Sequence, residues 1–159
     1  METTAVPPHA GVRFPPPFVY AAGILLGWLL DRKWRWPIAV RPSSWQSVVA
    51  AALIAFAFVM MIAAVGLFWR ARTSVIPNRP SSAFVVSGPY RFTRNPMYVG
   101  MAALYLGLSF VLNSWWVVVL LPVVLWIIQR AVIAREERYL QARFPVEYPE
   151  YCRRVRRWL

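Results

Sequence analysis

The sequence predicts an all-α integral membrane protein, with about four transmembrane helices followed by a C-terminal cytosolic or interfacial helical segment. Of its 159 residues, 59% are hydrophobic and 15% are charged, whereas soluble domains average roughly 45–50% apolar and about 25% charged residues. Several uncharged runs approach or exceed the length that crosses a bilayer. The basic residues stand between these runs, as juxtamembrane charges do.

The composition also excludes several classes of protein and site. The net charge of +12 invites a nucleic-acid interpretation, but nucleic-acid binding needs basic and aromatic residues gathered on a solvated face. Cys152 is the single cysteine and His9 the single histidine. A disulfide framework, a cysteine or histidine metal cluster and a Ser-His triad within the membrane are therefore not expected. We expect no metal site and no nucleic-acid partner.

The first span is expected at residues 18–30, after a proline-rich N-terminal tail at 1–17. The run is somewhat short for a 30 Å hydrocarbon core. Charged residues 31–33 follow it where a signal peptide would have its cleavage site, so we expect the segment to be retained. Gly23 and Gly27 have the spacing that lets two helices approach closely, although chance glycines in an apolar helix would give the same pattern.

The second span is expected at residues 47–69, which carry no charge and are followed by arginines. From Asn95 onward another 35 residues are uncharged, too many for one crossing. Asn113-Ser114 in the middle is the best turn candidate. We therefore expect a helical hairpin, with spans at 97–112 and at 115 to about 134.

The distribution of basic residues orients these four spans. With four crossings both termini share a side, and that side holds 14 of the 18 basic residues. Cytoplasmic segments are enriched in Lys and Arg, so both termini and the loop before Asn95 are expected in the cytosol. The chain then divides into a tail (1–17), two transmembrane helices (18–72) and a core of loop, hairpin and C-terminal helices (73–159).

The loop at residues 73–96 is the least membrane-like interior segment, because four prolines interrupt it. Arginines, tyrosines and an asparagine crowd together at its end, just before an apolar helix. One interpretation is a collar of interfacial side chains whose arginines reach the head groups. The other is an anchoring site for a charged cofactor.

Glu136 is the second candidate. Continuing the last span at 100° per residue places it in line with the apolar Val132 and Tyr139, whereas Glu137 falls on a wetter face. A carboxylate on an apolar face needs a cation as its partner. Two partners remain possible. One is Arg143, two turns away on nearly the same face, and the other is a bound cationic ligand.

The C-terminal residues suit a helix that lies in the membrane interface. Tyr148, Tyr151, Val155 and Trp158 form an apolar stripe at helical spacing, and four arginines fall largely elsewhere. Such a helix would cover the cytosolic mouth of the bundle. Cys152 is expected to be an inert thiol, because no base stands near it in the sequence.

The second half of the chain resembles the isoprenylcysteine carboxyl methyltransferase and phospholipid methyltransferase superfamily of integral membrane enzymes. The resemblance rests on motifs whose order and spacing surround the hairpin and which together cover residues 73–159. In this sequence they read Ser87-Gly88-Pro89-Tyr90-Arg91, Arg94-Asn95-Pro96-x-Tyr98-x-Gly100, Glu136-Glu137 and Phe144-x-x-Glu147-Tyr148-x-x-Tyr151.

The resemblance implies an S-adenosylmethionine-dependent enzyme that methylates a carboxylate or amine of an amphipathic, lipid-like acceptor. Its cofactor pocket would open to the cytosol, and the acceptor would enter from the bilayer. Glu136 would pair with the cofactor's ammonium, and Arg91 or Arg94 would bind its carboxylate or an anionic acceptor; these three are the candidate catalytic residues. The cofactor contacts of the family map onto Ser82, Ala83, Phe84, Val85, Tyr90, Asn95, Pro96, Met97, Tyr98 and Glu136.

Two positions depart from the isoprenylcysteine enzymes. Asn95 stands where they usually carry histidine, and Val132 stands where family members place an arginine on the acceptor side.

Three other functions remain open: a reductase of the same fold that uses NADPH, a non-catalytic membrane assembly factor, and a small four-helix transporter. A transporter usually needs an ionisable group inside a span, and here every acid lies at or beyond a span end.

Overall fold

The computed structural model describes residues 11, 15–41, 43–72 and 84–159, and these residues form helices and connecting segments without any strand. The expected all-α class is therefore confirmed for the described part of the chain. In chain order the elements are α1 (Pro16–Lys33), α2 (Ser44–Arg70), the 3-10 turn η1 (Gly88–Arg91), α3 (Pro96–Val111), α4 (Trp115–Ile128), the π-helical turn η2 (Gln129–Ile133), α5 (Ala134–Arg143) and α6 (Glu147–Arg154).

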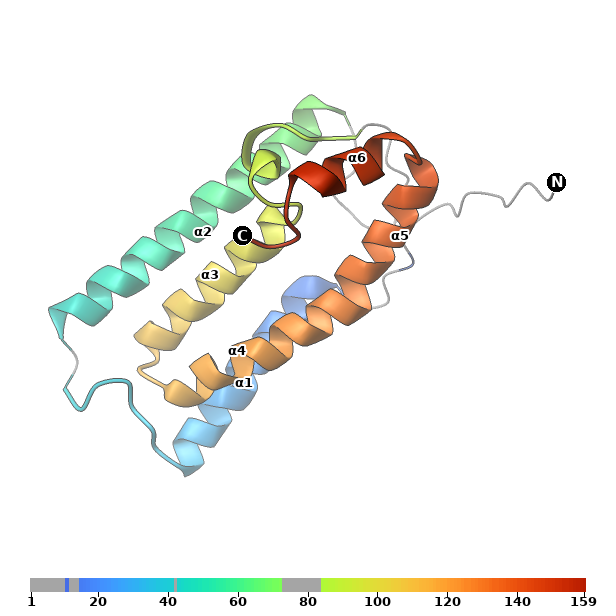
Figure 1. Cartoon of the computed structure of the whole chain (residues 1–159). Coiled ribbons are helices and arrows are strands. Elements are labelled where there is room, and N and C mark those ends of the chain that lie inside the picture. The colour runs from blue at the N-terminus through green and yellow to red at the C-terminus, as the bar shows by residue number, and fades with distance from the viewer. Residues whose placement is uncertain (1–10, 12–14, 42, 73–83) are drawn as a thin grey trace.

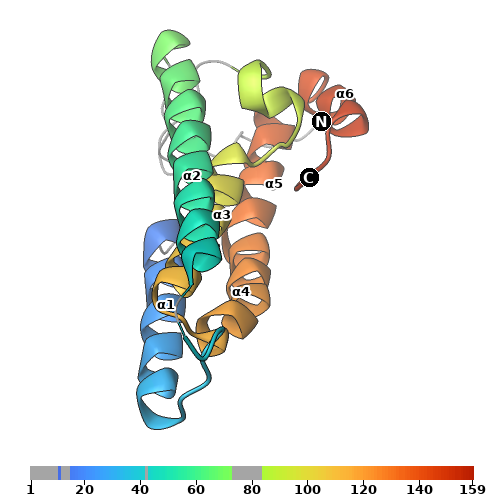
Figure 2. The same ribbon diagram turned by 90° about the vertical axis from the view of Figure 1, so that its left-hand side faces the viewer.

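The four long helices pack as two close pairs, α2 against α3 and α1 against α4 (Figures 1 and 2). Glycines allow the close approach. A Cβ on Gly27 would lie 2.8 Å from the Val117 Cα of α4, and one on Gly107 of α3 would lie 3.2 Å from the Ala50 carbonyl of α2. The close-packing interpretation of Gly23 and Gly27 is thus confirmed, because Gly27 lies against the backbone of α4 and a Cβ on Gly23 would lie 2.5 Å from the Val124 side chain of α4.

The expected hairpin turn lies between α3 and α4. Asn113 has a φ of 51°, in the left-handed region that asparagine tolerates better than most residues. Its side chain accepts hydrogen bonds from the Ala39 amide (3.0 Å), in the segment between α1 and α2, and from the Gln46 Nε2 (2.9 Å), in the first turn of α2. One residue therefore closes the hairpin and ties it to the start of α2 and to the segment that precedes α2.

Two helices are long and apolar enough to cross a membrane: α2, and the continuous helix Trp115–Arg143 formed by α4, η2 and α5. Only 17% of the apolar stretch of α2 is buried within the protein. A core helix of a soluble protein would be mostly buried, so the exposed apolar faces of α2 indicate a lipid environment. α3 is apolar but shorter, and the count of four spans stays a prediction.

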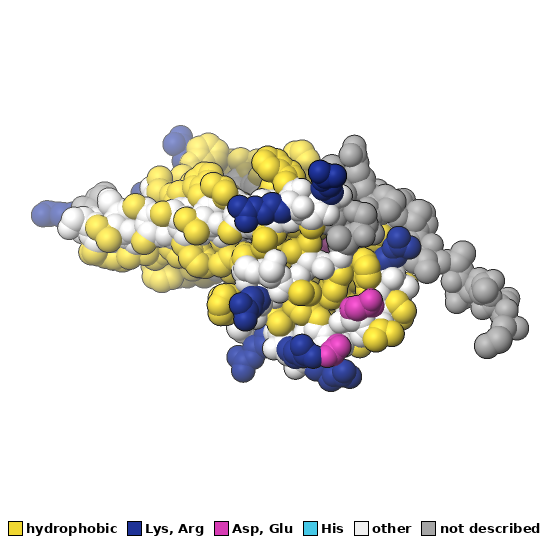
Figure 3. All heavy atoms as spheres, turned by 90° about the horizontal axis from the view of Figure 1, so that it is seen from above, with side chains coloured by type: hydrophobic (Ala, Val, Ile, Leu, Met, Phe, Trp, Pro, Cys, Tyr) yellow, Lys and Arg dark blue, Asp and Glu magenta, His cyan; other side chains and the backbone are white. Residues whose placement is uncertain are grey.

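The C-terminal region differs from the expected amphipathic helix. α6 ends at Arg154, and Val155 is extended with φ −124° and ψ 133°. The interpretation of one helical stripe reaching Trp158 is therefore wrong. Residues 155–159, which we call the C-terminal strap, instead run back across the N-terminal end of α3 (Figure 1). Basic side chains, with a few acidic ones, are spread over the end of the molecule that carries α6 (Figure 3).

Candidate functional site

The centre of the candidate site is a tyrosine and a glutamate from two helices. Tyr98, in the first turn of α3, donates a hydrogen bond from its hydroxyl to the Glu136 Oε1 at 2.7 Å. Among the described residues no cation forms an ion pair with this carboxylate. Arg143, the protein partner that the sequence left open, is exposed at the far end of α5 and does not fill this role.

A second buried tyrosine near this carboxylate comes from the 3-10 turn η1. Tyr90 is buried, and its ring lies 5.7 Å from that of Phe68 on α2. Burial, together with the nearby Tyr151 and Glu136, raises the pKa of Tyr90, so its hydroxyl remains a proton donor. That hydroxyl is buried and has no hydrogen-bond partner in the described part of the chain. Such orphaned groups are uncommon in native proteins and call for an explanation.

The C-terminal strap binds the corner that leads into α3. The Asn95 Nδ2 donates to the Arg157 carbonyl at 2.9 Å, and the Thr93 hydroxyl donates to the same oxygen at 3.2 Å. The Arg94 amide donates to the Arg156 carbonyl at 2.9 Å. Asn95 was expected to contact the cofactor. Its side-chain amide instead donates to a backbone carbonyl of the strap.

Glu137 anchors the strap and was not among the predicted site residues. Arg157 donates to both of its carboxylate oxygens, at 2.8 and 2.6 Å, and the Arg94 guanidinium lies 3.3 Å away. Arg94 also contacts the sulfur of Cys152. A helical wheel places Glu137 on a wet face because it takes no account of the strap. The sequence signal for this contact was the pair Glu136-Glu137, followed in the chain by an arginine-rich C-terminus that could supply a partner.

The junction between α4 and α5 is a π-helical turn, η2, for which the sequence carries no local signal. Such single turns recur at functional sites because they insert an extra residue and redirect the side chains that follow. Trp158 of the strap donates from its indole nitrogen to the Gln129 Oε1 at 3.0 Å, at the start of this turn. The strap therefore contacts both sequence segments that carry the candidate site.

The remaining predicted residues lie around this centre in different settings. Phe84 stacks on Phe144 at 5.3 Å and meets Tyr151 edge-on, also at 5.3 Å. Tyr151 in turn donates to the Tyr90 carbonyl at 2.6 Å, which links this aromatic cluster to η1. Pro96 is buried, Val85 and Met97 are half-buried, and Arg91 is exposed. Ser82 and Ala83 lie outside the described residues.

Glu136 and Tyr90 have complementary chemistry for a ligand that carries both an ammonium and a carboxylate. Glu136 offers a carboxylate oxygen without a cation, and Tyr90 offers an unpartnered hydroxyl close enough for the two to interact electrostatically. An ammonium group would neutralise the first and a carboxylate would accept from the second, so a ligand with an amino-acid end satisfies both. In the described ranges, no group of three or more His, Cys, Asp or Glu side chains could hold a metal ion.

Comparison with known proteins identifies the family. The family model described as "Phospholipid methyltransferase" matches residues 45–147, from the start of α2 to the start of α6. The chain belongs to the phospholipid methyltransferase family. The match spans η1, the hairpin and Glu136, which are the parts that carry the candidate site. This membership confirms the superfamily resemblance, and with the two apolar helices it marks the chain as a membrane protein of a methyltransferase family.

Two named relatives are similar over part of their length. The cobalt-zinc-cadmium resistance protein CzcN of Cupriavidus metallidurans is 38% identical over 94 residues, which cover 59% of this chain and 42% of the relative. The nickel-cobalt-cadmium resistance protein NccN of Alcaligenes xylosoxydans xylosoxydans is 32% identical over 115 residues, 71% of this chain and 53% of the relative. The chain thus spans about half the length of these relatives. No solved structure matches the chain.

Proposed function

We propose that this protein is an integral membrane methyltransferase that uses S-adenosylmethionine to methylate a carboxylate or amine of an amphipathic, lipid-like acceptor. The observation that carries the proposal is Glu136, a carboxylate held by Tyr98 with no cation paired to it among the described residues. Membership of the family supports methyl transfer as the reaction class.

The protein's own residues have three tasks in this proposal. Glu136 binds the cofactor's ammonium, and the hydrogen bond from Tyr98 fixes the direction in which that carboxylate points. Tyr90 donates its free hydroxyl to the cofactor's carboxylate. The C-terminal strap covers the corner at Asn95 and keeps water from the reacting groups.

The chemistry requires no metal and no histidine. The sulfonium cofactor, when bound, supplies an already activated methyl group. The protein then has to hold the acceptor's carboxylate or amine in line with that methyl and exclude water. Arg91, which is exposed and lies at the end of η1, is the better placed of the two candidate arginines to bind an anionic acceptor, because Arg94 is engaged with Glu137.

The topology forms part of the proposal. α1 and α3 cross the membrane together with α2 and the helix from Trp115, which gives four spans with both termini in the cytosol. The asymmetry of the basic residues supports this orientation. The candidate site then opens where soluble cofactor is available, and the acceptor arrives laterally from the bilayer.

The experiment uses purified, detergent-solubilised protein incubated with methyl-labelled S-adenosylmethionine and a total membrane lipid extract. We expect label in one chromatographically distinct lipid-like species, and none with a Glu136→Gln variant. Parallel titrations with S-adenosylhomocysteine and with NADPH separate the alternatives. Binding of NADPH alone would favour a reductase, and binding of neither would favour an assembly factor or a transporter. Either result would contradict the proposal.

A further inference from the structure

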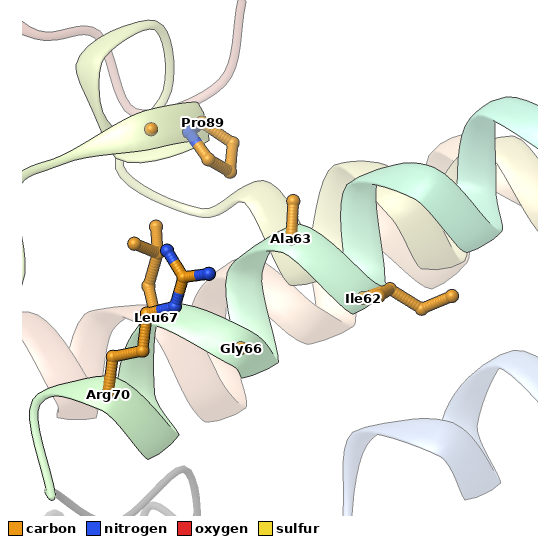
Figure 4. Close-up of a pocket in the computed structure, with 7 residues that line it drawn as sticks. Ile62, Ala63, Gly66, Leu67, Arg70 and Pro89 are labelled. Atoms are coloured by element: carbon orange, nitrogen blue, oxygen red, sulfur yellow. The ribbon is translucent and has the colours of Figure 1, made fainter.

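An apolar groove runs along the outside of the bundle, between the C-terminal half of α2 and the turn η1 (Figure 4). Its volume is about 370 Å³. Ile62, Ala63, Gly66 and Leu67 form the α2 side, and Gly88-Pro89 form the opposite side. The groove is separate from the candidate site, because Tyr90, the next residue of η1, is buried within the protein near Glu136.

A glycine leaves this groove hollow. A Cβ added to Gly66 would meet no atom within 4 Å, whereas one added to Gly88 would lie 2.8 Å from the Leu67 side chain. Gly66 therefore faces open space, while Gly88, with a φ of 58°, lets the turn lie close against α2. The result is a trough beside a tight contact rather than a flat helix face.

One end of the trough carries a cation. Arg70 lines the groove and forms no ion pair within the described ranges. Figure 4 shows its guanidinium turned back over Leu67, on the side of Pro89. Trp69 beside it is 75% exposed, as expected for an aromatic ring at a membrane surface. An apolar trough with an unpaired guanidinium at the head-group level is complementary to an anionic amphiphile.

We propose that this groove binds one anionic phospholipid, with its phosphate on Arg70 and an acyl chain lying over Gly66. The surrounding surface supports a lipid as the occupant, because α2 is a membrane-crossing candidate with little of its apolar stretch buried. The bound lipid joins α2 to η1 and so steadies the turn that carries Tyr90. The groove lies apart from the candidate site at Tyr98 and Glu136, and the proposal does not depend on the methyltransferase function.

The test uses full-length protein in mixed vesicles that contain a trace of photoactivatable phospholipid with a diazirine on one acyl chain. Two probes differ only in the head group, phosphatidylglycerol or phosphatidylcholine, and the labelled peptides are mapped by mass spectrometry. We expect the phosphatidylglycerol probe to label the segment 62–70 several-fold more than the phosphatidylcholine probe. Arg70→Gln should reduce labelling by the phosphatidylglycerol probe to the level of the phosphatidylcholine probe, because the guanidinium no longer favours a phosphate whose charge is not neutralised by choline.

Gly66→Leu fills the trough and should remove labelling of this segment by both probes, while the helix tolerates it because the position faces open space. Ala55→Leu, exposed elsewhere on α2, and Arg153→Gln, exposed on α6, are the matched controls and should leave labelling unchanged. Equal labelling by the two probes, an Arg70→Gln variant that labels like wild type, or cross-links from the groove to another part of this chain would overturn the proposal. Each of these readouts is independent of methyl transfer.

Discussion

Tyr98 and Tyr105 lie two turns apart on the same face of α3, but their hydroxyls are in opposite situations. Tyr98 donates to the Glu136 carboxylate at 2.7 Å, whereas the Tyr105 hydroxyl is buried without a partner among the described residues. Tyr98→Phe should weaken binding of S-adenosylhomocysteine roughly 10-fold, because a hydrogen bond to a charged group contributes about 1.5–3 kcal/mol. Isothermal titration calorimetry on the detergent-solubilised protein measures this.

Tyr105→Phe is the matched control. It removes a hydroxyl that makes no hydrogen bond, so it should leave cofactor affinity unchanged and leave the melting temperature equal or slightly raised. If the two variants bound equally well, the Tyr98 hydroxyl would have no part in orienting Glu136.

At single residues the sequence predicted the surroundings of Glu136 better than those of Glu137, while the role of Glu136 at a cofactor stays a prediction. The helical wheel identified Glu136 because its face is set by local periodicity, and Val132 and Tyr139 on that face are indeed buried. The role of Glu137 depends on Arg157, which lies 20 residues away in an extended strap. A contact of that kind follows from tertiary docking, which local patterns do not encode.

Among the elements, the contact between α1 and α4 depends on Gly27. Gly27→Ala should destabilise the protein by about 1–3 kcal/mol, because the added Cβ meets the backbone of Val117 at 2.8 Å and the helices must separate. Gly66→Ala, in α2, is the control and should stabilise by about 0.5–1 kcal/mol, since it gains helix propensity in open space. Thermal unfolding in detergent compares the two; equal melting temperatures would contradict the packing described here.

The C-terminal strap gives the second prediction at this scale. Arg157→Gln removes the paired hydrogen bonds to Glu137 and should weaken cofactor binding roughly 10-fold by loosening the corner at Asn95. Arg157→Lys should recover part of the affinity, whereas Arg154→Gln, which breaks an exposed pair with Glu150, should have no effect.

Hydrogen exchange provides a readout for the strap that does not involve cofactor. Amides of residues 90–98 should exchange faster in Arg157→Gln and at the wild-type rate in Arg154→Gln. Unchanged exchange in both variants would show that the strap does not hold this segment.

Elements were predictable where one local signal dominated. The uncharged runs predicted α2 and the hairpin to within a few residues, and Asn113 fixed the turn because asparagine tolerates a positive φ. The π-helical turn η2 and the end of α6 at Arg154 were not predictable in this way. Trp158 of the strap donates to Gln129 at the start of η2, and α6 ends where the strap turns back toward α3, so both features involve contacts between residues distant in sequence.

For the whole molecule the account predicts a topology. The test introduces single cysteines, Val40→Cys or Arg153→Cys, into a Cys152→Ser background. Val40 lies in the segment between α1 and α2 and is 93% exposed, and Arg153 is exposed on α6. Four spans with cytosolic termini put these positions on opposite sides of the membrane. A membrane-impermeant maleimide applied to intact cells should label Val40→Cys and leave Arg153→Cys unlabelled until the cells are lysed. Labelling of Arg153→Cys in intact cells would reverse the orientation.

The central claim is that Glu136 is neutralised by the ammonium of a small-molecule cofactor, and calorimetry with two ligands tests it most directly. S-adenosylhomocysteine carries that ammonium, whereas 5′-methylthioadenosine lacks the whole amino-acid end. We predict that Glu136→Gln weakens S-adenosylhomocysteine binding by roughly 100-fold, the scale of losing a partly buried ion pair, and leaves the weaker binding of 5′-methylthioadenosine unchanged. Equal affinity of wild type and Glu136→Gln for S-adenosylhomocysteine would contradict the account.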